Sequence, residues 1–170
     1  ENIVTHCPHS FNTFKKDYLE GEGDYKIYHH TQFILNLIKQ DKIKLENKVN
    51  KTVTYHDPCF LTKHNDITEA PRKIIESIPG LEFIELPRNK KNSFCCGGGG
   101  GRMWMEQPKE EERPNVERAR EVADTNADIL LTACPFCLVQ LEDGMKMIDK
   151  NEEIQVIDIG EFVIESIGEA

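Results

Sequence analysis

Five of the six cysteines form a pattern that is typical of a metal site. The pattern consists of one lone cysteine, one adjacent pair and one Cys-x-x-Cys pair: Cys59, Cys95, Cys96, Cys134 and Cys137. Thiolates are soft ligands that favour zinc or iron–sulfur clusters. Neighbouring Cα atoms lie about 3.8 Å apart whereas disulfides prefer about 4.4–6.8 Å, so the adjacent pair is unsuited to a disulfide. Two side-by-side thiolates instead favour a centre with several irons.

A run of glycines follows the adjacent cysteines directly. Because glycine lacks a Cβ, Gly97, Gly98 and Gly99 allow the backbone to approach a cofactor and to turn its N–H groups inward. We expect these three residues to line the cofactor, with a flexible loop as the alternative. A phosphate-binding loop is disfavoured, because no Lys-Ser/Thr follows the run.

Two other kinds of site remain open from the residues alone. Four of the thiolates would satisfy tetrahedral zinc and leave one over, which would make the chain a structural or regulatory zinc module. A cofactor-free dithiol exchanger using Cys134 and Cys137 would leave the other three cysteines of the pattern unexplained.

The elements that must position these thiols are short β-rich runs that alternate with helical patterns. The predicted strands are 3–6, 25–28, 53–56, 82–86, 128–132 and 155–157, and the predicted helices are 12–19, 31–40, 69–77, 115–125, 136–147 and 160–166. This order predicts an α/β fold with a mainly parallel sheet flanked by helices. Loops that follow parallel strands gather at one edge, so all five thiols should converge there. Segments 58–67 and 89–112 fit neither pattern.

The sequence also predicts an internal repeat. Thr5-His6-Cys7-Pro8 resembles Thr132-Ala133-Cys134-Pro135, and Ser10 stands where the second copy has Cys137. We therefore expect 1–45 to be the tail of a preceding copy and 46–170 to be a complete one, related by a pseudo-twofold axis, in a piece of a longer chain. Cys7 should lie apart from the five thiols, and finding it in their site would contradict the repeat.

The cysteine pattern is similar to the cysteine-rich CCG domain of the B-type and D-type polypeptides of heterodisulfide reductase and their relatives. More narrowly, residues 56–59 (His-Asp-Pro-Cys) and 101–105 (Gly-Arg-Met-Trp-Met) resemble the iron–sulfur oxidoreductases associated with electron-transfer flavoproteins. Ser10 departs from the relatives, which commonly have a cysteine there.

By residue match, this resemblance implies that the five cysteines hold a noncubane [4Fe-4S] cluster. It implies an electron-transfer domain of a multidomain oxidoreductase that passes electrons between a flavin or flavoprotein partner and a disulfide or quinone acceptor. The substrate and any catalytic residue stay open. The implied partners are the flavoprotein and other domains of the same longer chain, with membrane contact only through parts absent from this sequence.

Composition narrows the setting. The formal net charge of −9 opposes binding to a phosphate backbone, so no nucleic-acid partner is expected. Sparse cysteines and the lack of a signal segment indicate reduced thiols in the cytoplasm, at the inner face of the membrane in the full-length protein.

Four features near the cysteines could have secondary roles. His56 and His64 could donate hydrogen bonds to a cluster sulfur, although structural or surface roles are the plainer interpretation. Trp104 could shield the site, contact a partner or pack in the core. The charged run 109–120 resembles an ordinary solvated helix with its lead-in.

Overall fold

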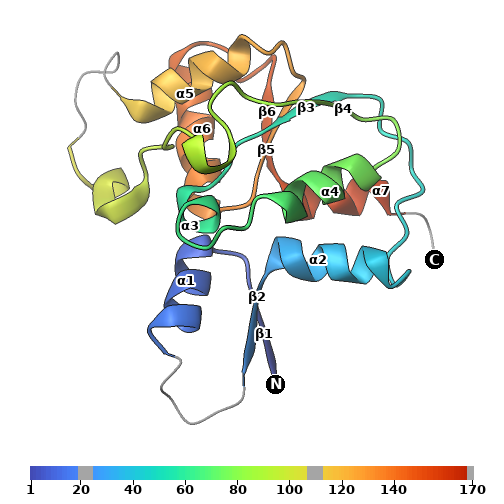
Figure 1. Ribbon diagram of the computed structural model, residues 1–170. Coiled ribbons are helices and arrows are strands. Elements are labelled where there is room, and N and C mark those ends of the chain that lie inside the picture. Colours follow the sequence, from blue (N-terminus) through green and yellow to red (C-terminus); the bar gives the residue numbers. More distant parts are fainter. Residues whose placement is uncertain (19–24, 107–112, 168–170) are drawn as a thin grey trace.

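The computed structural model describes residues 1–18, 25–106 and 113–167 (Figure 1). Its elements in chain order are β1 (Asn2–Thr5), α1 (Pro8–Lys16), β2 (Lys26–His29), α2 (His30–Lys39), β3 (Thr52–Tyr55), α3 (Cys59–Thr62), α4 (Glu69–Ser77), β4 (Glu82–Ile84), the 3₁₀ helices η1 (Lys90–Asn92) and η2 (Gly99–Trp104), α5 (Pro114–Ala123), β5 (Ile129–Thr132), α6 (Pro135–Met147), β6 (Gln155–Asp158) and α7 (Ile159–Ser166).

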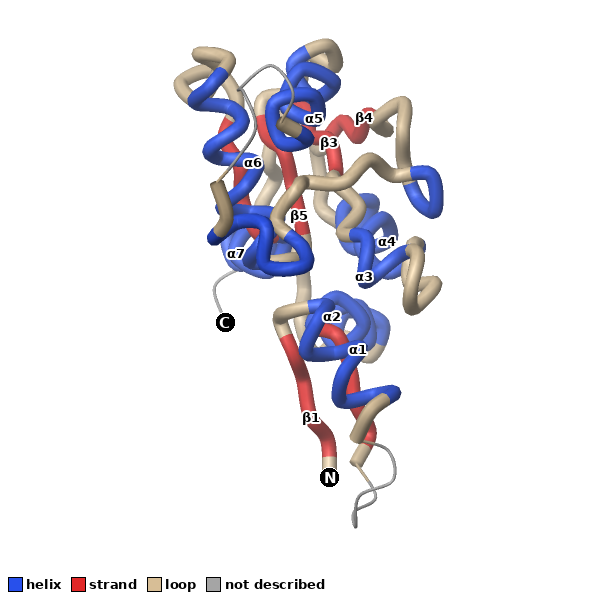
Figure 2. Tube along the Cα trace, turned by 90° about the vertical axis from the view of Figure 1, so that its left-hand side faces the viewer, coloured by secondary structure: helices blue, strands red, loops and turns tan. Residues whose placement is uncertain are grey.

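The strands form two parallel sheets, which confirms the predicted α/β class. The main sheet has four strands in the order β4-β3-β5-β6, and β1 pairs with β2 in a separate two-stranded sheet. Figure 2 shows β1 below the main sheet, with α1 and α2 lying between the two sheets. We call residues 1–39 with the small sheet the first unit, and the rest the second unit.

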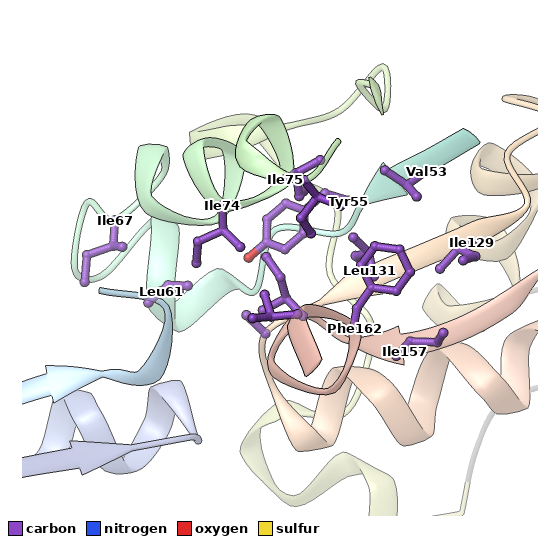
Figure 3. Packing of buried hydrophobic residues seen from close by; sticks show 14 of the residues in the cluster. Val53, Tyr55, Leu61, Ile67, Ile74, Ile75, Ile129, Leu131, Ile157 and Phe162 are labelled. Atoms are coloured by element: carbon purple, nitrogen blue, oxygen red, sulfur yellow. The ribbon is translucent and has the colours of Figure 1, made fainter. Parts of the chain in front are cut away.

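Helices cover both faces of the main sheet because its strands are apolar on both sides. Val53, Tyr55, Ile129 and Leu131 belong to the hydrophobic cluster that includes residues of α4 and α7 (Figure 3). Leu130 points to the opposite face and belongs to the cluster that includes residues of α5 and α6. Neighbouring residues of β5 thus contribute to different cores.

The strand order reverses at the centre of the main sheet. After β3 the chain leaves through α3 and α4 on one face, whereas after β5 it leaves through α6 on the other. Adjacent strands whose connections diverge in this way leave a crevice at their carboxyl ends, which is where open α/β sheets bind ligands.

The predicted elements differ from the structure in two places. Helix α1 begins at Pro8, four residues before the predicted start, because Pro8 is suited to the first helical turn and Cys7 is the N-cap. The two segments without a pattern contain the short helices α3, η1 and η2. Residues 19 and 107–112 of the predicted ranges lie outside the described residues.

One negative finding concerns membranes. Within the described ranges, no helix is both long and apolar enough to cross a bilayer.

Candidate metal centre

The five predicted ligands follow three neighbouring strands of the main sheet. Cys59 opens α3 just after β3, the Cys95-Cys96 pair lies in the loop after β4, and Cys134 is the N-cap of α6 directly after β5. The structure brings these thiols together. Side-chain hydrogen bonds link Cys59 to Cys95, Cys95 to Cys96, Cys96 to Cys137 and Cys137 to Cys134.

The thiol cluster has a buried side and an open side. Cys96, Cys134 and Cys137 are buried, Cys59 is partly buried, and Cys95 is exposed. A group held by these thiols would therefore be shielded by the second core cluster and would approach the surface beside Cys59 and Cys95.

Backbone N–H groups surround the sulfurs. The Gly97 N–H donates to Cys95 Sγ at 3.2 Å, and the Gly98 N–H donates to Cys96. Gly97 has φ +86°, in the left-handed region that favours glycine, and a Cβ on Gly98 would lie 2.8 Å from Gln140 Cγ. Open space surrounds Gly99. Two of the three predicted glycines thus face the thiols through their amides.

The thiols share their protons unequally. Hydrogen bonds from Cys59, Cys96 and the Gly97 amide lower the pKa of Cys95 to about 2. Hydrogen bonding to Cys134 and Cys96, together with complete burial, raises the pKa of Cys137. Dithiol exchange requires an accessible thiol with a lowered pKa, so a buried Cys137 with a raised pKa argues against the exchanger.

The spacing of the sulfurs bears on the choice between zinc and a cluster. Two thiolates on one zinc lie about 3.8 Å apart when the bonds are about 2.3 Å. Among the described residues, the potential ligand atoms that lie within 4.8 Å of one another belong to a single group, His56, Cys96 and Cys137. Four thiols do not meet in such a group, and this wider arrangement suits a centre with several metal ions.

Asp57 fixes the loops that carry the cysteines. Its buried carboxylate accepts hydrogen bonds from Arg72 Nη1 at 2.9 Å and Nη2 at 2.8 Å, and from the Lys90 backbone N–H at 2.7 Å. Its backbone C=O accepts from Ser93 Oγ at 3.1 Å. The loop before Cys95 is therefore attached to the residue that lies two positions before Cys59.

His56 and Arg118 form a buried polar pair behind the thiols. Arg118 Nε donates to His56 Nδ1 at 3.1 Å, and both residues are buried. Burial, followed by the charge of Arg118, holds the pKa of His56 well below its usual value. His56 is therefore neutral.

The prediction of a solvated helix at 109–120 was wrong for its described part. Asn115, Arg118, Ala119 and Val122 are all buried in α5. Their spacing of three and four residues is that of one helix face, so the position of Arg118 on this apolar face was the signal that sequence reasoning missed.

The prediction that Cys7 lies apart was also wrong. Its thiol is hydrogen-bonded to Cys134, which lowers the pKa of Cys7 to about 3 against the opposing effect of partial burial. The reason is that the small sheet points its carboxyl ends at those of the main sheet, so that the N-caps of α1 and α6 meet. This contact removes one argument for the repeat, while the similar order β1-α1-β2-α2 and β5-α6-β6-α7 remains.

Two further residues lie away from the thiols. Trp104 is 81% exposed, so packing in the core is excluded. The His64 ring stacks on Phe60 with centroids 4.4 Å apart, and its backbone C=O accepts from Lys16 Nζ.

Comparisons with known proteins agree with this geometry. Residues 53–142 match the family described as the cysteine-rich domain CCG. The chain is 34% identical over 167 residues to the probable iron-sulfur-binding oxidoreductase FadF of Bacillus subtilis, which covers 98% of this chain and 24% of FadF. It is also 34% identical to EtfAB:quinone oxidoreductase of Syntrophomonas wolfei, over 96% of the chain and 24% of that protein.

A third relative shows higher identity. The D-type polypeptide of the dihydromethanophenazine:CoB--CoM heterodisulfide reductase of Methanosarcina barkeri is 40% identical over 99% of this chain and 41% of its own length. The chain thus spans between about a quarter and two fifths of the length of these curated relatives.

Proposed function

We propose, given that this chain belongs to the CCG family of cysteine-rich domains, that its five clustered thiols hold one iron–sulfur cluster of a larger oxidoreductase. The observation that carries the proposal is the convergence of Cys59, Cys95, Cys96, Cys134 and Cys137 in a site that is buried on one side and open on the other.

The donor set fits such a group. An iron–sulfur cluster bound there supplies electron transfer, with a potential that depends on ligands, hydrogen bonds and exposure. The residues supply soft ligands, amides of Gly97 and Gly98 that stabilise negative sulfur, and a buried side that excludes water. The exposed Cys95 gives an electron donor or acceptor an approach of short range. A noncubane [4Fe-4S] form is the specific cluster that we propose.

The partners are part of the proposal. The names of the relatives mention electron-transfer flavoprotein, quinone and a heterodisulfide. We propose that the longer protein takes electrons from a flavoprotein and passes them to a quinone or a disulfide, on the cytoplasmic side of a membrane. Mixing the reduced protein anaerobically with each acceptor, and following reoxidation by absorbance, identifies which acceptor is used.

The domain division is also proposed. We propose that 1–45 is the tail of a preceding CCG-type repeat and that 46–170 is a complete one. Each region has a parallel strand pair whose first strand leads through Cys-Pro into a helix, at Cys7-Pro8 and at Cys134-Pro135. Superposition of 1–45 on 128–168 tests the division, and unrelated paths of the two backbones would reject it.

Replacement of Cys96 tests the cluster directly. The chain is loaded anaerobically with iron and sulfide, and the wild type should contain about four irons if the cluster is of the [4Fe–4S] type. Cys96→Ser should lose the iron chromophore because a ligand is lost, while circular dichroism shows that the helices remain. Cys7→Ser is the matched comparison and should keep the iron, because Cys7 is outside the proposed ligand set.

Two results would contradict the proposal. One is an unchanged iron spectrum in Cys96→Ser. The other is stoichiometric zinc, bound by these thiols in preference to iron when both metals are offered without oxygen, which would establish the zinc module instead.

A further inference from the structure

His56 lies behind the thiols at the carboxyl end of β3. Its backbone N–H donates to the Leu131 C=O at 2.8 Å, which fixes the residue against β5, and its side chain is 1% exposed. One of its ring nitrogens lies within 4.8 Å of both the Cys96 and the Cys137 sulfurs. The imidazole is therefore the polar side chain that closes the buried side of the site.

The contacts of Arg118 determine which ring nitrogen carries the proton. A guanidinium is only a donor, so His56 Nδ1 must accept the hydrogen bond from Arg118 Nε, and the proton of the neutral ring is on Nε2. Arg118 cannot turn away, because its Nη1 also donates to the Arg88 C=O at 2.9 Å and to Glu121 Oε2 at 2.6 Å.

This N–H is a buried donor without an acceptor in the described chain. His56 Nε2 has no hydrogen-bond partner among the described residues, and neither does Arg118 Nη2. An unpaired buried donor costs about 1–3 kcal/mol, so its presence calls for a partner. The sulfurs beside the ring are the only acceptors of the right chemistry that the geometry offers among those residues.

A direct bond from His56 to a metal does not fit these contacts. A histidine that binds a metal donates its second ring N–H to a carboxylate or carbonyl, which leaves the other nitrogen free for the metal. At His56 the direction is reversed, because Nδ1 accepts and Nε2 is protonated.

We propose that His56 donates its Nε2–H to sulfur at the Cys96–Cys137 end of the site, and that Arg118 acts as the positioning residue that holds the ring in this tautomer. The inference rests on the proposed cluster, and the acceptor is a cysteine thiolate or an inorganic sulfide. A hydrogen bond to sulfur favours the more negative reduced state, so it raises the reduction potential.

Potentiometry on the anaerobically loaded chain tests this assignment. His56→Leu removes the donor, and His56→Gln keeps an N–H of similar reach. At a fixed potential, the reduced-to-oxidised ratio should fall about tenfold in His56→Leu, which is about 59 mV for one electron, and should fall less in His56→Gln. His64→Leu is the control, since the His64 ring stacks on Phe60 instead, and its potential should not change.

A spectroscopic measurement on the wild type needs no variant to assemble a cluster. Protein labelled with ¹⁵N-histidine should show a weakly coupled, solvent-exchangeable proton near the reduced cluster. In the metal-free chain, NMR should show the His56 proton on Nε2. A strong direct iron–nitrogen coupling, or a proton on Nδ1, would overturn the inference.

The outcomes separate the two proposals. Full iron content with an unchanged potential in His56→Leu rejects the role of His56 and leaves the cluster intact. A wild type that takes up no iron rejects both.

Discussion

At the scale of single residues, the site depends on where N–H groups are available. Gly97 and Gly98 place amides on the sulfurs of Cys95 and Cys96, and Gly97 does so with a backbone conformation that side chains disfavour. The glycine run therefore has two parts, because the space around Gly99 is open. Only the first part is constrained by the thiols.

Alanine substitutions distinguish these two parts. Gly97→Ala should lower the free energy of unfolding by about 1–2 kcal/mol, because a Cβ is strained at φ +86° and would lie 3.3 Å from Pro114 Cβ. Gly99→Ala, the matched control, should change it by less than about 0.5 kcal/mol. Urea denaturation of the metal-free chain measures both, and equal effects at the two positions would contradict the distinction.

At the scale of elements, buried ion pairs connect the loops that carry the cysteines. Asp57 joins β3 to α4 through Arg72 and to the loop after β4 through Lys90 and Ser93. Arg72 also binds Glu85 through Nε, with the two atoms 2.5 Å apart. Loops that follow different strands thus keep a fixed separation, as a multi-thiol site requires.

Removal of the Asp57 carboxylate should be costly. Asp57→Ala leaves Arg72 as a buried charge with only Glu85, so we expect a loss of about 3–5 kcal/mol in the free energy of unfolding. Glu69→Gln is the control, because the Glu69–Lys90 pair is exposed and such pairs contribute about 0–1 kcal/mol. A loss below about 1 kcal/mol for Asp57→Ala in urea denaturation would show that the carboxylate does not hold the loops.

At the scale of the whole molecule, the two units meet at their carboxyl ends. We call this contact the seam. His6 Nε2 lies 3.2 Å from Asp158 Oδ2, and His30 Nε2 lies 3.3 Å from Asp158 Oδ1. His29 is buried beside His30, with ring centroids 4.4 Å apart. Histidines of the first unit thus surround one carboxylate of the second.

The seam should weaken in mild acid. Burial, with a further effect from His30, lowers the pKa of His29 to about 3. The unfolded chain binds this proton below about pH 6.5 and the folded chain does not, so stability is complete above about pH 6.5 and falls toward about pH 3. The slope is at most about 1.4 kcal/mol per pH unit. Asp158, whose pKa is lowered, adds a loss at lower pH, and His6, whose pKa is raised, acts in the opposite direction.

Comparison with His29→Asn isolates this group. Urea denaturation between pH 4 and pH 7 should show a shallower loss of stability in the variant, because asparagine does not titrate. The exposed His64→Asn should follow the wild type. Parallel curves for the wild type and His29→Asn would show that His29 does not carry the pH dependence.

The sequence by itself determined the class of the fold and the identity of the clustered thiols. Alternating strands and helices predicted the parallel sheet, since the periodicity of apolar residues is a local property. The position of Cys59, Cys95 and Cys134 after strands predicted their convergence, because parallel strands direct their following loops to one edge.

Only the tertiary structure decided the contacts that join distant elements. Cys7 meets Cys134 because two sheets pack end to end, and no local pattern encodes that packing. Arg118 reaches His56 across 62 positions of sequence, and Asp57 binds Lys90 across 33. Which polar groups are buried, and which nitrogen of His56 carries the proton, depends on partners that become neighbours only when the chain has folded.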